Sequence, residues 1–166
     1  MVLLNASASK DKPIIKKHQL KCLIETVVEG VSLTRSPDLI NLEKIDPSLL
    51  VECDRKLLLK GLYNIADDAC RELKDSGERV HIRVASDGKF ANVIISNPGT
   101  IKDIKRVLKK GFSNNNSSGL GMSIVEECLT QTKCNVAYNV CDVNNKVTAI
   151  IKIPKTEGLR ICAFSY

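Results

Sequence analysis

The sequence predicts a layered α/β domain in which helices and strands alternate along the chain. Three observations lead to this prediction. Apolar residues recur at helical spacing in some segments and at strand spacing in others, two pairs of predicted strands are joined by turn sequences, and 166 residues with 43% hydrophobic content suffice for one buried core. We expect one domain in residues 18–156, a flexible basic leader in residues 1–17, and an edge strand or tail in residues 157–166.

The first part of the chain predicts one helix and two strands. Residues 18–31 carry apolar side chains at helical spacing, which indicates an amphipathic helix. Residues 39–45 alternate between apolar and polar side chains, and residues 49–53 form a short apolar run after a turn at Asp46. Both segments are therefore predicted to be strands.

A long helix is predicted next, with Asp54 as its N-cap, an end near residue 74 and Gly77 as the closing glycine. Its apolar face and its polar stripe lie on different sides of the helix. The apolar face consists of Leu58, Leu62, Ile65, Ala69 and Leu73, and the polar stripe of Asn64, Asp68, Arg71 and Asp75. The stripe is either a solvated face with an Asp-to-Arg ion pair three residues apart or a site for a cation and a phosphate.

The second part of the chain predicts two hairpins with a helical region between them. The paired segments are residues 80–85 with 90–95, across an Asp-Gly turn, and residues 135–140 with 146–153. The strand that ends at Ile95 runs into a Ser-Asn-Pro-Gly turn, and a short basic helix follows in residues 101–110.

A loop of small residues is predicted to lead directly into a helix at Gly119 and Gly121. Apolar residues recur at helical spacing after these glycines, as far as Gln131. A helix start presents unpaired N–H groups and a partial positive charge, and glycine lets an anion approach the backbone. The segment is therefore either an anion-binding helix start or an ordinary flexible loop with an N-cap.

The composition excludes several classes of protein. No apolar run approaches the roughly 18 to 20 residues of a membrane span, and residues 1–9 lack the features of a signal peptide, so we expect a cytoplasmic protein that is not embedded in a membrane. The net charge of +6 is scattered and aromatic residues make up only 4%, which argues against nucleic acid as a partner. Seven cysteines without a Cys-x-x-Cys pair indicate neither a zinc site nor a disulfide framework.

Four of these features follow one another in an informative order. A polar-striped helix comes first, then a strand ending in Asn-Pro-Gly, a basic segment with Phe112, and a Gly-Leu-Gly helix start. This order resembles the ATP-binding catalytic domain of sensor histidine kinases, in the Bergerat-fold superfamily, over about residues 39–154. The resemblance implies an α/β (α+β) two-layer sandwich with a mixed, mostly antiparallel sheet covered on one face by about three helices.

The long helix resembles the N-box of that family, in which two asparagines four residues apart face the nucleotide and the second ligates Mg²⁺. Asn64 matches the first asparagine, and Asp68 replaces the second with another hard oxygen ligand. The resemblance therefore implies ATP and Mg²⁺ as cofactors, with Asn64 and Asp68 at the metal. Arg71 stands where a basic residue of the family often reaches the phosphates.

Residues 95–101 resemble the G1 box, with Asn97 in place of the aspartate that recognises adenine. Asn97 can accept a hydrogen bond from the adenine amino group and can also donate one. Residues 119–125 resemble the G2 box, and Phe112 resembles the aromatic residue of the lid. The nucleotide-binding residues that the resemblance implies are Asn64, Asp68, Arg71, Asn97, Gly99, Ile101, Lys109, Lys110, Phe112, Ser118, Gly119, Leu120, Gly121 and Met122.

The resemblance favours phosphoryl transfer over ATP hydrolysis. Hydrolytic members of the superfamily place a glutamate four residues before the N-box asparagine to activate water, whereas Lys60 and Asn64 supply no acid there. The implied function is transfer of the ATP γ-phosphate to a histidine of a separate phosphoacceptor domain, in trans or outside this chain, and through it to a response regulator. His18 has no acidic neighbour of the usual His-Glu kind.

Two alternatives stay open. The departures from the family's motifs at Asn97, Thr100 and Ser118 fit a degenerate, non-enzymatic module that keeps the fold as a docking or regulatory surface. A free-standing serine kinase of the anti-sigma type fits the short length, although the lid and the Asn-Pro-Gly strand end argue against it. The kinase interpretation requires the central helix, the Asn-Pro-Gly segment and the glycine-rich helix start to line one pocket.

Overall fold

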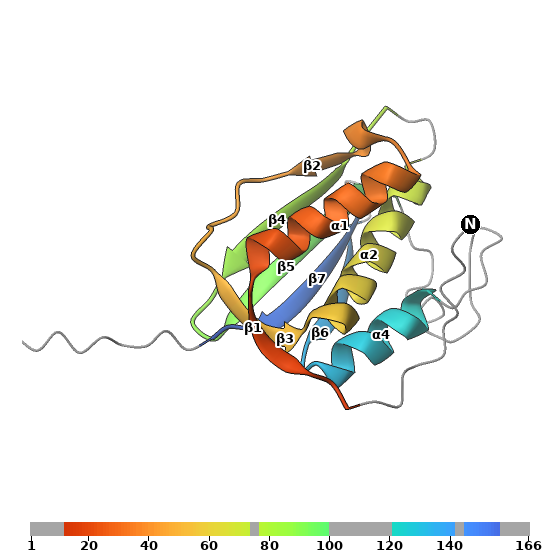
Figure 1. Cartoon of the computed structure of the whole chain (residues 1–166). Coiled ribbons are helices and arrows are strands. Elements are labelled where there is room, and N and C mark those ends of the chain that lie inside the picture. Colours follow the sequence, from red (N-terminus) through yellow and green to blue (C-terminus); the bar gives the residue numbers. More distant parts are fainter. Residues whose placement is uncertain (1–11, 74–76, 100–120, 142–144, 157–166) are drawn as a thin grey trace, which may run out of the picture.

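In the part of the chain that the computed structural model describes, three α-helices and a five-stranded sheet form two layers (Figure 1). The structure describes residues 12–73, 77–99, 121–141 and 145–156, and only the backbone for residues 121–124, 140 and 141. Within these ranges all three helices cover the same face of the sheet (Figure 1). The predicted α/β two-layer sandwich is therefore confirmed.

The main sheet is mixed and mostly antiparallel, as predicted. Its strand order is β2-β4-β5-β7-β6, and among the described strands only β2 and β4 run parallel. The bounds are β2 Ile40–Leu42, β4 Val80–Ser86, β5 Phe90–Pro98, β6 Asn135–Cys141 and β7 Lys146–Pro154. Both predicted hairpins, β4–β5 and β6–β7, are confirmed, and β5 lies at the centre with a partner on each side.

The helices bury their apolar sides against the sheet. Their bounds are α1 Leu20–Thr34, α2 Arg55–Glu72 and α4 Gly121–Gln131. The five residues of the predicted apolar face of α2 are each at most 7% exposed, because this helix lies in the middle of the helical layer. None of the described helices combines the length and the apolar character that crossing a membrane requires.

The start of α2 follows the sequence prediction. The Asp54 carboxylate accepts hydrogen bonds from the backbone N–H groups of Lys56 and Leu57, at 2.9 and 3.1 Å. These are two of the N–H groups that a helix start leaves without partners, so Asp54 is the N-cap. Past the end of the helix, Gly77 has a φ of 71°, a left-handed conformation that glycine adopts without strain.

A second, two-stranded sheet was not predicted in full. Strand β1, Ile15–Gln19, pairs antiparallel with β3, Leu50–Asp54, so three residues assigned to the flexible leader belong to a strand. The sequence Ile-Lys-Lys-His-Gln hides this strand because its side chains are largely exposed and do not alternate. The pairing with β3 decides the conformation, helped by a 2.7 Å hydrogen bond from the Ile14 N–H to Asp54.

Two further boundaries differ from the prediction. The strand predicted in residues 39–45 is limited to β2, because only three residues pair with β4 and a 3-10 turn, Pro37–Leu39, precedes them. The predicted turn after Ile95 is strand: β5 continues to Pro98 because β7 pairs with it up to the Pro98–Lys146 pair. Proline has no N–H to donate, and it is tolerated there because it is the last residue of the strand and the pairing with β4 has already ended at Ser96.

The core between the two layers also contains cysteine. Among the described cysteines, Cys53, Cys70, Cys128 and Cys134 are buried free thiols, and Cys22 is exposed. Burial raises the pKa of Cys53 to about 12 and that of Cys70 to about 11, because an apolar environment disfavours the thiolate. These thiols therefore pack as small hydrophobic side chains.

Candidate functional site

Helix α4 packs against α2 and runs in the opposite direction (Figure 1). Near one end of the pair, a Cβ added to Gly61 would lie 3.1 Å from Cδ2 of Leu129, which shows how closely the helices approach. Further along, Asp68 of α2 and Glu126 of α4 both act electrostatically on Tyr138 of β6. The α4 N-terminus, where the predicted glycine-rich start lies, is therefore at the same end as the polar residues of α2.

Asn64 and Asp68 lie one helical turn apart on α2. The Asn64 Nδ2 donates a 2.8 Å hydrogen bond to the backbone oxygen of Lys60, and within the described residues its Oδ1 accepts none. The Asp68 carboxylate is 40% exposed and lies 3.1 Å from Nη1 of Arg71. The predicted Asp-to-Arg ion pair is therefore present. Oδ1 of Asn64 and Oδ2 of Asp68 have no hydrogen-bond partner among the described residues.

The environment of Asp68 disfavours its charge. Burial raises the pKa of this carboxyl, and the nearby negative charges of Asp67 and Glu72 raise it further, while Arg71 opposes them. A cation at this position would relieve the repulsion. The carboxylate of Asp68 and the amide oxygen of Asn64 are ligands of the kind Mg²⁺ prefers, so the donors fit this ion.

The described residues hold no ready-made metal centre. Nowhere in the described ranges do three or more His, Cys, Asp or Glu side chains gather closely enough to hold a metal ion. Mg²⁺ in nucleotide sites is usually held by one or two protein groups together with phosphate oxygens and water. Any Mg²⁺ at Asn64 and Asp68 would depend on phosphate oxygens for the rest of its coordination.

Tyr138 of β6 is partly buried, and two carboxylates lie close enough to act on its hydroxyl. Burial raises the pKa of the Tyr138 hydroxyl, and the carboxylates of Asp68 and Glu126 raise it further. Neither Tyr138 nor Glu126 was predicted from the sequence as a site residue. No sequence signal would have found them, because they come from β6 and α4 and meet Asp68 only through the fold.

A second carboxylate on α2 holds two arginines. Asp67 is 13% exposed and accepts hydrogen bonds from Nε of Arg35, at 2.7 Å to Oδ1, and from Nη2 of Arg35, at 3.1 Å to Oδ2. Nη2 of Arg71 also contacts the Oδ2 atom, at 2.7 Å. The i, i+4 spacing of Asp67 and Arg71 is visible in the sequence, but the partnership with Arg35 is not.

Asn97 lies near the end of the central strand and faces the helices. Side chains alternate along a strand, and Val93 and Ile95 belong to the core under the helices, so Asn97 points to the same side. It is 6% exposed, and its Nδ2 donates a 2.9 Å hydrogen bond to the Pro98 oxygen. This bond orients the amide, and among the described residues Oδ1 accepts no hydrogen bond.

Gly99 follows with a conformation that favours glycine. Its φ is 144°, in the region that residues with a side chain rarely adopt, and its N–H donates a 2.6 Å hydrogen bond to the backbone oxygen of Asn145. A Cβ at this position would lie 3.6 Å from Nδ2 of Asn97. The backbone conformation therefore favours glycine at this position.

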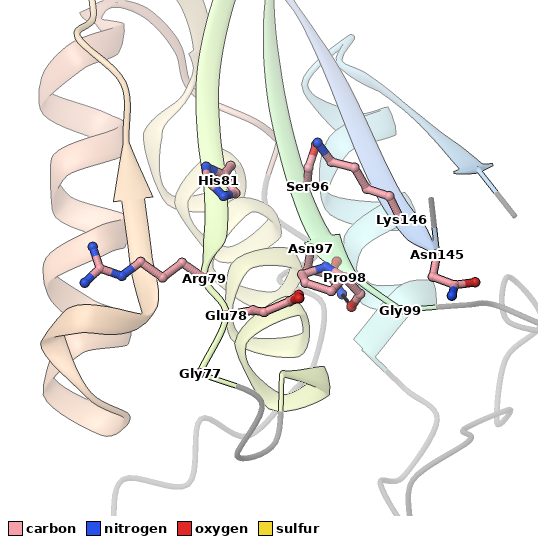
Figure 2. Close-up of a pocket in the computed structure, with 10 residues that line it drawn as sticks. All are labelled: Gly77, Glu78, Arg79, His81, Ser96, Asn97, Pro98, Gly99, Asn145 and Lys146. Carbon is pink, nitrogen blue, oxygen red and sulfur yellow. Dashed lines mark hydrogen bonds between the residues drawn. The ribbon is translucent and has the colours of Figure 1, made fainter. Parts of the chain in front are cut away.

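A cavity of about 640 Å³ lies at this end of the sheet (Figure 2). Its lining residues are Gly77, Glu78, Arg79, His81, Ser96, Asn97, Pro98, Gly99, Asn145 and Lys146. It extends from Asn97 around the strand ends to Ser96 and His81, which a strand's alternation places on the other face of the sheet. Asn64, Asp68 and Arg71 do not line this cavity, although α2 packs against β5.

Several predicted site residues lie outside the described ranges. These are Ile101, Lys109, Lys110, Phe112, Ser118, Gly119 and Leu120. The helix predicted in residues 101–110 and the tail predicted in residues 157–166 also lie outside the described ranges. Gly121 and Met122 are the first two residues of α4, and the structure describes their backbone only.

Solved structures share this fold, although no family model and no curated protein matches the sequence. The mycobacterial sensor histidine kinase MprB superposes with a TM-score of 0.72 at 22% identity, over 86% of this chain and 98% of that one. The catalytic domain of the histidine kinase ThkA gives 0.67 at 24% identity, over 86% and 97%. Full-length ShkA in complex with AMPPNP gives 0.72 at 18% identity, over 90% and 33%. The chain therefore has the fold of the catalytic domains of sensor histidine kinases.

Proposed function

We propose that this chain is the ATP- and Mg²⁺-binding catalytic domain of a histidine kinase. It transfers the γ-phosphate of ATP to a histidine of a separate phosphoacceptor domain, which passes it to a response regulator. The observation that carries the proposal is the shared fold, together with the hydrogen-bonding groups that α2 and β5 present at the positions resembling the N-box and the G1 box. Full-length ShkA, of which 33% matches this fold, was solved in complex with AMPPNP.

The residues of α2 bind the metal and the phosphates in this proposal. Asn64 and Asp68 would hold Mg²⁺ through their side-chain oxygens, and Arg71 would contact the phosphates together with the N-terminus of α4. When bound, Mg²⁺ neutralises negative charge on the phosphates during transfer. The protein's own contribution is to position the phosphates, because phosphoryl transfer needs little covalent chemistry from side chains.

Asn97 recognises adenine in this proposal. One Nδ2 hydrogen is already donated to the Pro98 oxygen, which leaves the second Nδ2 hydrogen and Oδ1 for a ligand, with Oδ1 as the acceptor for the adenine amino group. An aspartate would offer adenine the same kind of group, because both oxygens accept a hydrogen bond from the exocyclic amino group. The asparagine therefore keeps the function of the residue that it replaces.

We further propose the limits and surroundings of the domain. The single domain proposed for residues 18–156 extends to Ile15, because β1 pairs with β3. Its partners are ATP, the phosphoacceptor domain and, through that domain, a response regulator. The site of action is the cytoplasm, where ATP is available.

Calorimetry with ATP in the presence and absence of Mg²⁺ tests nucleotide binding. We expect Asp68→Ala and Asn97→Ala each to weaken ATP binding by about tenfold or more, since each removes a polar contact worth roughly 1.5 kcal/mol or more. Asp38→Ala and Asn139→Ala are matched controls, because both side chains are exposed and neither residue lines the cavity. No binding at millimolar nucleotide, or equal affinity in all four variants, would reject the assignment.

A transfer assay separates a kinase from a docking module. The chain is incubated with ATP labelled at the γ-phosphate and with a phosphoacceptor domain carrying a candidate histidine. Acid-labile label on that histidine is expected. Binding without transfer to any acceptor supports the degenerate module, and acid-stable phosphoserine in the product supports the serine kinase.

A further inference from the structure

We propose that Arg35, at the end of α1, is a positioning residue for phosphate recognition. It acts through Asp67, whose carboxylate it shares with Arg71, and so sets the direction in which Arg71 offers its guanidinium. The proposal rests on the function proposed above, in which Arg71 contacts the phosphates. It adds a residue from a different helix, outside every motif that the sequence analysis used.

The Asp67 carboxylate is the shared element. Its Oδ1 accepts from Nε of Arg35 at 2.7 Å, and its Oδ2 accepts from Nη2 of Arg35 at 3.1 Å and from Nη2 of Arg71 at 2.7 Å. Arg35 thus makes the two-pronged contact that a guanidinium and a carboxylate form best. Arg71 is left with one of the two oxygens.

This division determines what Arg71 can do with its other nitrogen. Its Nη1 lies 3.1 Å from Oδ1 of Asp68, on the partly exposed side of α2. Phosphate oxygens are better partners for an arginine than a single exposed carboxylate oxygen, because they offer more charge and several acceptors. A phosphate group can therefore replace Asp68 at Nη1, while Asp67 keeps Nη2 in place.

Removal of Arg35 would change that arrangement. Both oxygens of Asp67 would become available to Arg71, one turn away on the same helix, and a two-pronged pair would draw the guanidinium toward α1. Arg71 would then be held away from the side on which Asp68 and Asn64 lie. We therefore expect a loss of phosphate recognition without any direct contact between Arg35 and the ligand.

The position of Arg35 is itself well defined. It follows the last residue of α1, and its N–H donates a 2.9 Å hydrogen bond to the Val31 oxygen. The adjacent Thr34 Oγ1 lies 3.1 Å from the Tyr63 hydroxyl of α2, and the Tyr63 ring lies 3.3 Å from where a Cβ of Gly30 would be. Thr34 therefore offers a control contact across the same α1–α2 interface that does not touch Asp67.

The first test compares ligands that differ in their phosphates. Dissociation constants for ATP and adenosine are measured for the natural chain, Arg35→Gln, Arg35→Lys and Thr34→Val, with thermal melting to confirm folding. We expect Arg35→Gln to weaken ATP binding about 5- to 20-fold and to leave adenosine binding unchanged, within the usual range of coupling between sites. Arg35→Lys keeps the positive charge but loses the two-pronged contact with the carboxylate, so we expect ATP affinity between those of Arg35→Gln and the natural chain. Thr34→Val should change neither ligand's affinity.

The second test asks whether Arg35 acts through Arg71. Arg35→Gln is measured again in an Arg71→Gln background, where it should have no further effect on ATP affinity. Equal losses in both backgrounds, equal losses for ATP and adenosine, or an equal effect of Thr34→Val would each overturn the inference. If the natural chain binds no ATP at all, the proposed function itself fails, which is a different result from ATP binding that Arg35→Gln leaves unchanged.

Discussion

The two sides of helix α2 place neighbouring aspartates in opposite environments. On the α1 side, Asp67 is 13% exposed and accepts three hydrogen bonds from two arginines. On the β6 and α4 side, Asp68 is 40% exposed and has one ion pair, with other negative charges nearby. The same side chain is thus part of the structure at one position and a candidate ligand at the next.

The pKa shifts follow the same division. Burial alone would raise the pKa of Asp67, but the hydrogen bonds and the charges of Arg35 and Arg71 outweigh it, and the pKa is lowered. For Asp68 burial is again the largest cause, and the charges of Arg71 and Arg35 do not offset it, so the pKa is raised. A carboxylate with too few partners is well suited to a bound cation.

Replacement of Asp67 should destabilise the protein far more than replacement of Asp68. Asp67→Asn leaves two partly buried guanidiniums without their carboxylate and should lower the free energy of unfolding by about 2 kcal/mol. Asp68→Asn, one residue further on, should change it by less than about 0.5 kcal/mol, because its ion pair is largely exposed. Urea denaturation at pH 7 of the nucleotide-free protein measures both. Equal losses would show that the two sides of α2 do not differ.

The dependence on pH should separate the two aspartates further. The lowered pKa of Asp67 means that its contribution to stability is present above its unfolded value of about 4 and is lost as the pH falls through the folded value. The pKa of Asp68 is shifted in the opposite direction, so ionisation of this carboxyl lowers the free energy of unfolding at neutral pH. This cost decreases as the pH falls through the raised folded pKa.

Unfolding free energies from pH 7 to pH 3 test these signs. The deficit of Asp67→Asn relative to the natural chain should persist down to about pH 4 and shrink only below it. If Asp68→Asn has a higher free energy of unfolding than the natural chain at pH 7, this difference should vanish by about pH 4. The assignment of opposite pKa shifts would be contradicted if the stability differences of both variants from the natural chain disappeared over the same pH range.

The smallest expected effect compares the packing on the two sides of α2. Alanine in place of an interior helical glycine gains roughly 0.5 to 1 kcal/mol in helix propensity. At Gly61 the added Cβ meets Leu129, which is 1% exposed and must shift, so Gly61→Ala should be destabilising by about 1 kcal/mol. At Gly30 it meets the edge of the partly exposed Tyr63 ring, so Gly30→Ala should be neutral or slightly stabilising. Thermal melting of the two variants tests this. A higher melting temperature for Gly61→Ala than for Gly30→Ala would contradict the prediction.

The sequence determined those features that depend on neighbouring residues. The capping of α2 by Asp54, its buried face and the two hairpins follow from spacing and local chemistry, and all were predicted. The order of the motifs also indicated the fold, which the solved histidine kinase structures share. The roles assigned to Asn64, Asp68 and Asn97 remain predictions until nucleotide binding is measured.

Only the tertiary structure decided which residues from distant segments meet. Strand β1 exists because β3 pairs with it, and Pro98 is in a strand because β7 extends that far. Arg35 and Asp67 are 32 residues apart in the chain and 2.7 Å apart in space, a contact that no local pattern encodes. Periodicity and capping report the chemistry of adjacent residues, whereas a shared carboxylate depends on how two helices pack.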